Sequence, residues 1–550
     1  MAKKDSLVKG TLILTLAAFV ARALGVLQKI PLVYLIKDAG MATYGIAFNI
    51  YTPLLTIATA GIPSALSKLV SENMELGQVA EAERIYKAAV RFALATGLIM
   101  TVFLYAVAPY YATRVAGDPD AVWSIRALAP ALLLFPLIAM IRGYFQGRQM
   151  MMPNGMSQIV EQILRLITSV GLAWLFLALG MGQVWAISGA SFGGVMGSVG
   201  ALAVLIWYML RLRKSDRMEG IAAKAEAGRA AAERIPYRTI YGRIFRTSLP
   251  IVLFSMTVPM IYLIDSSTVI RLLEPDIGYL AAKDMLGVVV GRAQSLAGIP
   301  IILAIALSQS IVPIVSAAYA KGNWLQVQQQ ASKALRLAMV TGLPAVLAIS
   351  IGARPINQLL FPAQSDYISL DQTVGIIAFL TVTAIFQIIM QTTGSILMGL
   401  GVMKPLILQV IVGLSIKLIG SYALAPVWGI YGIMASTALC FIVMMGLGLW
   451  SLNRRIRVPM MTARRWIGLA CSVAGVCLAG IPLERLMWAH NLGAAPAIVT
   501  LLDTIVVCGM VVLAYIILLG ITRVYTREDL QELPGPFRKW AAKSKAAKGG

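Results

Sequence analysis

Apolar stretches about 20 residues long recur along almost the whole chain, and they constrain its fold more than any other feature. A helix needs about 20 apolar residues to cross the roughly 30 Å hydrocarbon core of a bilayer. A composition of 59% hydrophobic and 13% charged residues is also typical of an integral membrane protein. We therefore expect an all-α membrane protein with about 14 transmembrane helices. The apolar windows lie near 10–36, 44–67, 88–112, 122–145, 154–180, 184–210, 243–268, 284–317, 333–359, 373–400, 404–424, 428–452, 463–483 and 497–522.

Positive charge is concentrated in alternate connections between these windows. The connection at 211–243, the one at 453–465 and the segment beyond 522 are rich in Lys and Arg, whereas the fifth-to-sixth and eleventh-to-twelfth connections contain neither. Cytoplasmic loops of membrane proteins carry an excess of Lys and Arg. We therefore expect both termini in the cytoplasm. The net charge of +23 then indicates contact with an anionic membrane surface rather than with nucleic acid.

An internal repeat divides the chain into two halves. A shift of 245 residues aligns 76–98 with 321–343, and a shift of 252 places Arg165 on Lys417. Each half contains an even number of windows, six, which predicts two parallel six-helix lobes related by a pseudo-twofold axis. The expected organisation is an N-terminal lobe (1–210), a basic cytoplasmic linker (211–242), a C-terminal lobe (243–452), two further helices (453–522) and a basic cytoplasmic tail (523–550).

The first window contains two cations where a cation is expensive. Arg22 lies near its middle, and Lys29, seven residues later, shares the same helix face. Gly25 lies between them and leaves room for a bulky group. A central arginine costs about 2.5–3.5 kcal/mol on insertion scales, so Arg22 should face a wet cavity or a partner. Two explanations of Arg22 remain open: it captures an anionic substrate, or it forms an ion pair with a buried carboxylate.

The eighth window repeats this pattern with Arg292, which follows Gly287 and Gly291. The glycines let a neighbouring helix or a ligand approach closely. Anion binding is one explanation of Arg292, and an ion pair with Asp284 or Asp265 is the other.

A second polar set is a candidate secondary cavity or gate: Arg142, Glu161, Arg165, Asp265 and Lys417. Glu161 and Arg165 are four residues apart and can neutralise each other, whereas Lys417 has no acidic neighbour on its own helix. Arg142 lies at a window end, where it either snorkels to the interface or meets an anionic headgroup. Cations outnumber the carboxylates within the windows, which predicts a cationic cavity that attracts a phosphate or pyrophosphate.

Signatures of enzymes and metal sites are missing from the sequence. It contains no P-loop, no HExxH and no CxxC, and it has one histidine, His490. The acidic triplet Asp118-Pro119-Asp120 formally spells DxD, but we interpret it as a hairpin feature of an external loop. We expect a transporter without catalytic residues, cofactor or metal.

Four stretches resemble a known family: RALGVLQKIPL (22–32), TAGIPSALSKLVSE (59–72), RGYFQG (142–147) and GRAQSLAGIPIILAIALSQSIVPIVSAAYAKGN (291–323). They look like the YtgP/SpoVB branch of the polysaccharide-export flippases, which is related to the lipid II flippase MurJ in the multidrug/oligosaccharidyl-lipid/polysaccharide superfamily. The resemblance implies 14 helices in a bacterial cytoplasmic membrane, with a groove for an undecaprenyl tail between the last two.

The resemblance also implies site residues. The family's essential arginines in the first and eighth helices fall on Arg22 and Arg292. MurJ-like members carry another arginine in the second helix, but the stretch YTPLLTIATAG at 51–61 has none, and we expect Lys29 to replace it.

The expected function is therefore that of a flippase for an undecaprenyl-pyrophosphate-linked glycan precursor, with lipid II as the first choice, acting in cell-wall synthesis by alternating access. The substrate-binding residues would be Arg22, Lys29, Arg292 and Gly25, and the partners are the lipid-linked substrate and membrane lipids. The alternatives are a multidrug cation antiporter of the same architecture, an exporter of another lipid-linked polysaccharide precursor, and a non-transporting scaffold for wall synthesis.

Overall fold

Within the residues that it describes, the computed structural model of the chain is all-helical. These residues are 7–59, 61–218, 242, 248–361, 365, 367–490, 497–522 and 524. The helices, with η denoting a π-helical turn, are α1 (Leu7–Thr59), α2 (Ile62–Glu75), α3 (Val79–Tyr110), η1 (Tyr111–Ala116), α4 (Ala121–Leu128), α5 (Ala131–Gly147), α6 (Met152–Ala178), α7 (Gln183–Met218), α10 (Thr257–Ile277), α11 (Tyr279–Gly287), η2 (Val288–Ala293), α12 (Gln294–Ala320), α13 (Trp324–Ile351), α14 (Ala353–Leu360), α15 (Leu370–Gly399), α16 (Lys404–Trp428), α17 (Ile430–Ile456), α18 (Ala463–His490) and α19 (Ala497–Ile521).

The all-α membrane fold predicted from the sequence is confirmed, whereas the count of 14 spans is not. In the described part of the chain, 12 helices are long and apolar enough to cross a membrane, or up to 13 with one pair that is bent by 41° after Ser255. The first candidate runs from Leu16 to Glu75 and combines most of α1 with α2. It is interrupted at Lys37, where φ is 56° and ψ is −176°, and it covers the first two predicted windows.

Many helices extend beyond the windows that predicted them. The helix expected at 88–112 begins at Val79, and the one expected at 333–359 begins at Trp324. The added turns of α3 carry Glu81 and Lys87 and are amphipathic, so a hydropathy window does not include them. These turns project past the apolar part of each span.

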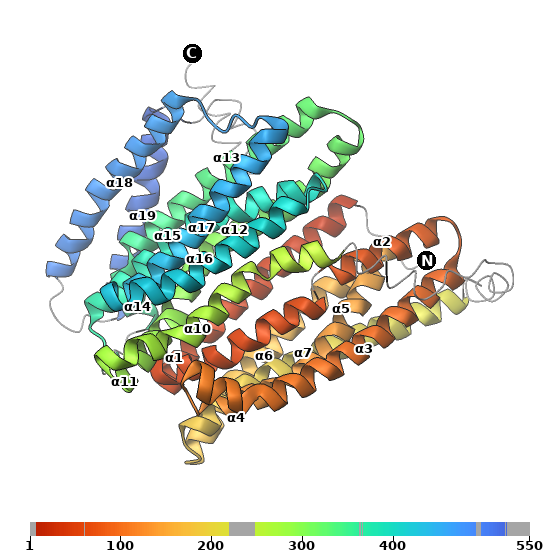
Figure 1. The fold of residues 1–550 in the computed structure, drawn as a ribbon, viewed down its shortest axis with the longest axis horizontal. Coiled ribbons are helices and arrows are strands. Elements are labelled where there is room, and N and C mark those ends of the chain that lie inside the picture. Colours follow the sequence, from red (N-terminus) through yellow and green to blue (C-terminus); the bar gives the residue numbers. More distant parts are fainter. Residues whose placement is uncertain are drawn as a thin grey trace.

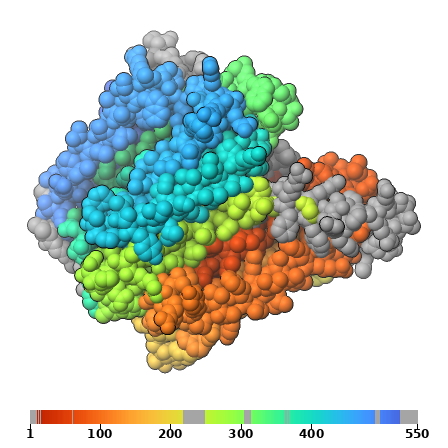
Figure 2. Space-filling view, in the orientation of Figure 1, coloured from red at the N-terminus to blue at the C-terminus, as the bar shows by residue number. Residues whose placement is uncertain are grey.

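The helices form two bundles that lie side by side (Figure 1). Helices α1–α7 pack together as the N-terminal bundle, α10–α17 pack together as the C-terminal bundle, and α18 and α19 pack on α13. Figure 1 shows the bundles meeting at the end that carries α4, α11 and α14 and diverging toward the other end. In the space-filling view, part of α1 is visible in the seam between them (Figure 2). We call the first end the closed end.

The predicted linker and tail lie mostly outside the described residues. Helix α7 continues through the start of the predicted linker to Met218, and α17 continues to Ile456. Residues 219–241 and 525–550 belong to the undescribed part of the chain, so the lobe boundaries at 210, 243 and 452 stay predictions.

Glycines on α7 bring it against α6 and so fix the position of the charged residues on α6. A Cβ atom added at Gly197 would lie 2.7 Å from the carbonyl oxygen of Glu161 and 3.1 Å from the Cβ of Arg165. Close backbone contact of this kind is how small residues stabilise helix pairs in lipid.

Candidate substrate site and interbundle latch

The cationic face of α1 is directed toward the C-terminal bundle. The Nζ atom of Lys29 donates a hydrogen bond of 2.9 Å to the carbonyl oxygen of Val290 in η2. Arg22 lies two turns earlier on the same face, about 10 Å along the helix. Its side chain is exposed and makes no hydrogen bond or ion pair with the described residues. Of the two explanations for Arg22, the ion pair is therefore absent from the described contacts, and the guanidinium is available to a ligand.

Gly25 lies beside this face and turns toward α6. A Cβ atom added there would lie 3.7 Å from Oε1 of Gln162, which is an ordinary van der Waals contact. This is the one contact within 4 Å that such an atom would make with the described residues, and Gly25 as a substrate residue stays a prediction.

Arg292 is buried in an ion pair with Asp38, a partner that the sequence did not predict. Its Nε and Nη2 atoms donate to the two carboxylate oxygens of Asp38 at 2.9 and 2.5 Å. Its Nη1 atom donates to Oδ1 of Asn357 at 3.3 Å and to the carbonyl oxygen of Phe361 at 3.2 Å. Arg292 is 2% exposed and Asp38 is 3% exposed. In this conformation Arg292 therefore joins the bundles and is not open to a ligand.

The backbone around this pair explains its position. Arg292 and Val290 both lie in the π-helical turn η2, and π-helical turns are frequent at functional sites. Gly287, just before η2, touches the carbonyl oxygen of Asp38 so closely that a Cβ atom would clash with it. Asp38 itself directly follows the break at Lys37, which ends the first part of α1.

Further contacts between the bundles surround this pair. Asn49 donates to the hydroxyl of Ser266 at 2.6 Å, and the hydroxyls of Tyr111 and Ser267 lie 3.0 Å apart. We call these contacts, together with the Lys29–Val290, Asp38–Arg292 and Asp118–Lys283 contacts, the interbundle latch.

The Asp118-Pro119-Asp120 triplet belongs to this latch and is more than a hairpin feature. The Nζ atom of Lys283 in α11 lies 2.9 Å from Oδ1 of Asp118 and 3.1 Å from Oδ2 of Asp120. Asp118 is fully buried and also accepts a hydrogen bond of 2.5 Å from Thr43. The prediction of a simple hairpin is thus corrected: the triplet follows η1 as a turn, and its carboxylates bind the other bundle.

Glu161 is shared by two arginines of the N-terminal bundle. Its Oε2 atom lies 3.0 Å from Nη2 of Arg142, and its Oε1 atom lies 3.4 Å from Nη2 of Arg165. Arg142 also donates to Ser157 at 2.9 Å. The interpretation of Glu161 and Arg165 as a mutually neutralising pair agrees with this geometry, and Arg142 contacts the same carboxylate.

Neighbouring Arg148, at the end of α5, is paired separately with Asp216 of α7 through two hydrogen bonds of 2.5 and 2.8 Å. Burial opposes the charge of Arg148, but the hydrogen bonds and charge of Asp216 raise the pKa of its guanidinium above the ordinary value. Arg148 therefore stays cationic and fastens α5 to α7.

Lys417 and Asp265 form a buried ion pair between α16 and α10. The Nζ atom of Lys417 lies 2.6 Å from Oδ1 of Asp265, 2.9 Å from the carbonyl oxygen of Ile433 and 3.0 Å from the hydroxyl of Ser436. Lys417 is 0% exposed. Lys417 has no acidic neighbour on its own helix, as the sequence indicated, but Asp265 of α10 supplies a carboxylate partner in the folded chain.

These pairs change the expected charge of the cavity. Three of the five cations counted within the windows, Arg165, Arg292 and Lys417, each have a carboxylate partner. The sequence count missed Asp38, which lay between two windows. The cationic character expected for the whole cavity is therefore concentrated at Arg22 and Lys29. In the described residues, no group of three or more His, Cys, Asp or Glu side chains is arranged to hold a metal ion.

Two helical bundles that meet at one end are the architecture of membrane transporters built from repeats. Comparison with known proteins agrees. The model of the family described as "Polysaccharide biosynthesis protein" matches residues 7–319, and the chain belongs to this family. The model described as "Lipid II flippase MurJ" matches residues 288–525.

Individual relatives support the same class. Over 459 residues the chain is 29% identical to the lipid II flippase MurJ of Bacillus subtilis (strain 168), covering 82% of this chain and 83% of that protein. It is 23% identical over 538 residues to stage V sporulation protein B of the same organism, covering 96% and 98%. A solved structure of MurJ in an inward closed conformation superposes with a TM-score of 0.62 at 13% identity, covering 93% of this chain and 98% of that one. The resemblance found in the sequence motifs is confirmed.

Proposed function

We propose that the protein moves an undecaprenyl-pyrophosphate-linked glycan precursor, with lipid II as the first choice, across the cytoplasmic membrane for cell-wall synthesis. The observation that carries this proposal is Arg22, which is exposed, makes no hydrogen bond or ion pair with the described residues, and lies on the same face of α1 as Lys29. A guanidinium in this position suits a phosphate or pyrophosphate because it offers bidentate, charge-assisted hydrogen bonds. The MurJ match over residues 288–525 supports the choice of lipid II.

Alternating access would then depend on breaking and remaking the latch. With both termini in the cytoplasm, as the basic loops predict, the closed end faces outward and Arg22 is reached from the cytoplasmic side. A pyrophosphate bound to Arg22 approaches Lys29 next, and Lys29 holds η2 through one hydrogen bond to Val290. Competition for Lys29 would loosen η2, expose Arg292 and let the bundles part at the outer end. Arg292 then becomes the second cation of the pyrophosphate path.

The multidrug cation antiporter is the less favoured function. Multidrug transporters of the same superfamily share the fold, but binding a cation needs a carboxylate that is free to receive it. Glu161 is paired with two arginines, and Asp265 is paired with Lys417.

Translocation by the purified chain in proteoliposomes tests the substrate class. Fluorescent lipid II, a second undecaprenyl-pyrophosphate-linked glycan and the cationic dye ethidium are offered in parallel vesicles, with and without an imposed membrane potential. We expect lipid II to become accessible on the far leaflet faster than in protein-free vesicles. Movement of the second glycan alone would assign another lipid-linked precursor, and movement of ethidium alone would overturn the proposal.

A further inference from the structure

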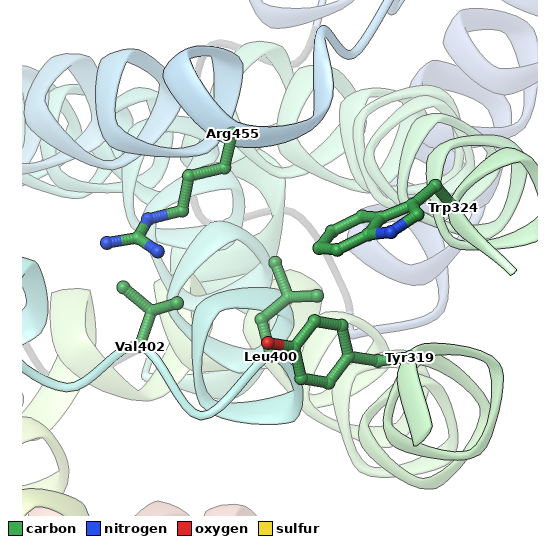
Figure 3. Close-up of a pocket in the computed structure, with 5 residues that line it drawn as sticks. All are labelled: Tyr319, Trp324, Leu400, Val402 and Arg455. Carbon is green, nitrogen blue, oxygen red and sulfur yellow. The ribbon is translucent and has the colours of Figure 1, made fainter. Parts of the chain in front are cut away.

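A pocket lies in the C-terminal bundle on residues that take no part in the latch. It has a volume of about 220 Å³ and is lined by Tyr319, Trp324, Leu400, Val402 and Arg455. Figure 3 shows Trp324 and Tyr319 reaching into it from one side and Arg455 from the other. The two rings meet edge to face with centroids 5.3 Å apart. The pocket is therefore built from two aromatic rings, two aliphatic side chains and one guanidinium.

The length of α12 places this pocket at the level of the lipid headgroups. Arg292 lies in the latch at one end, and Tyr319 follows 27 residues later on continuous helix, which is about 40 Å. The hydrocarbon core of a bilayer is about 30 Å thick. Trp and Tyr side chains prefer the interface between hydrocarbon and water, and Trp324 and Tyr319 are 54% and 43% exposed. The pocket is thus open to lipid at the interface opposite the latch.

The surroundings of the pocket are strongly cationic. The three segments that form it, 314–330, 397–410 and 445–461, contain five Lys and Arg residues and no Asp or Glu: Lys321, Lys404, Arg454, Arg455 and Arg457. Arg455 makes no hydrogen bond or ion pair with the described residues, whereas Arg454 lies over the ring of Trp450 at 3.9 Å. Helices α13 and α16 also begin at this pocket, and helix N-termini favour anions.

The repeat supplies an internal comparison. The shift of 245 residues places Tyr319 and Trp324 on Met74 and Val79, in the corresponding turn of the N-terminal bundle. That turn is acidic, with Glu72, Glu75, Glu81 and Glu83 close to it. Aromatic rings therefore occur together with cations, in segments that contain no Asp or Glu, at one of the two equivalent turns, and topology alone does not account for them.

From this we infer that the pocket binds the headgroup of an anionic phospholipid, with the phosphate on Arg455 and the glycerol region against Trp324 and Tyr319. Basic pockets between membrane helices are known to hold such headgroups. A bound lipid would tie the α12–α13 turn to the end of α17, and this role is independent of the substrate carried at Arg22.

Lipid retention by the purified full-length chain tests the inference. Native mass spectrometry from detergent with added dioleoyl-phosphatidylglycerol or dioleoyl-phosphatidylcholine counts bound lipids for the wild type, for Arg455→Gln and for Trp324→Leu. The matched control is Arg464→Gln, because Arg464 is an exposed cation at the start of α18 outside the pocket. Gel filtration confirms that each variant is folded.

We expect one phosphatidylglycerol to bind the wild type more tightly than phosphatidylcholine, and Arg455→Gln to weaken it about tenfold, the value of one charge-assisted hydrogen bond. Arg464→Gln should leave it unchanged. Equal retention by wild type and Arg455→Gln, or equal losses in Arg455→Gln and Arg464→Gln, would overturn the inference. Displacement of phosphatidylglycerol by undecaprenyl pyrophosphate, lost in Arg455→Gln, would instead assign the pocket to the substrate.

Discussion

The Asp38–Arg292 pair makes the most specific prediction about how the bundles separate. Replacing Asp38 with Asn keeps the shape of the side chain but removes its charge. Arg292, 2% exposed, would then lose the carboxylate that accepts two of its hydrogen bonds, and its contacts with Asn357 and Phe361 would not replace that charge. Breaking a buried ion pair by removing one of its members costs about 3–5 kcal/mol. That cost applies to the conformation with a closed latch, because opening hydrates Arg292.

The expected consequence is a large shift in the population of conformations. A cost of about 3–5 kcal/mol corresponds to a change of roughly 150- to 5,000-fold in the equilibrium between closed and open latch. Spin labels at Thr113→Cys in η1 and Leu280→Cys in α11, two exposed positions on opposite bundles, report this equilibrium by double electron–electron resonance after replacement of the native cysteines. The Asp38→Asn variant should show a longer distance than the parent.

A matched control is available at the same end of the molecule. Arg354 pairs with Glu484 at 2.9 Å, but this contact joins α14 to α18 and does not cross between the bundles. Arg354→Gln should leave the distance between the labels unchanged. An unchanged distance in Asp38→Asn, or an equal lengthening in Arg354→Gln, would refute the assignment of Asp38 and Arg292 to a latch.

Three other predictions concern single side chains. Lys417→Met should lower the free energy of unfolding by about 3–5 kcal/mol, because it removes the cation that pairs with the buried carboxylate of Asp265. Adding Asp265→Leu should restore much of this loss. An unchanged thermal-unfolding midpoint in the single variant would contradict the prediction. Arg22→Ala should leave the free energy of unfolding within about 1 kcal/mol of the wild-type value, because Arg22 has no described partner, and a larger loss would mean a structural role. Asp118→Asn should lengthen the distance between spin labels at Thr113→Cys and Leu280→Cys, since it weakens the contact with Lys283, and an unchanged distance would argue against that contact.

The sequence predicted the helical architecture well because hydropathy and length report directly on membrane crossing. It placed helix ends less well, because the amphipathic turns that extend α3 and α13 contain polar residues and lie outside the apolar windows. The division of α1 at Lys37, a residue with a positive φ, lies in the connection between the first two predicted windows, 10–36 and 44–67, where Lys37 and Asp38 interrupt the apolar sequence.

The sequence singled out the cations of the candidate site but did not predict which residues they contact. Arg22, Lys29 and Arg292 stood out because cations are rare in apolar windows. Their partners did not, because Asp38 lies in a short connection 254 positions from Arg292, and pairing over that separation depends on how the bundles dock. The same reason hid the contact of Lys417 with Asp265. The sequence feature that could have indicated a buried partner was a charged residue close to the edge of a window, such as Asp38.

The central claim is that an anionic headgroup passes Arg22 between the two bundles, and a translocation assay of Arg22→Ala with lipid II tests it most directly. The variant is reconstituted beside the wild type at equal protein density, after its fold has been checked by thermal unfolding. The account predicts wild-type translocation and loss of most of that rate in Arg22→Ala, with partial recovery in Arg22→Lys. Translocation at the wild-type rate by a folded Arg22→Ala variant would contradict it.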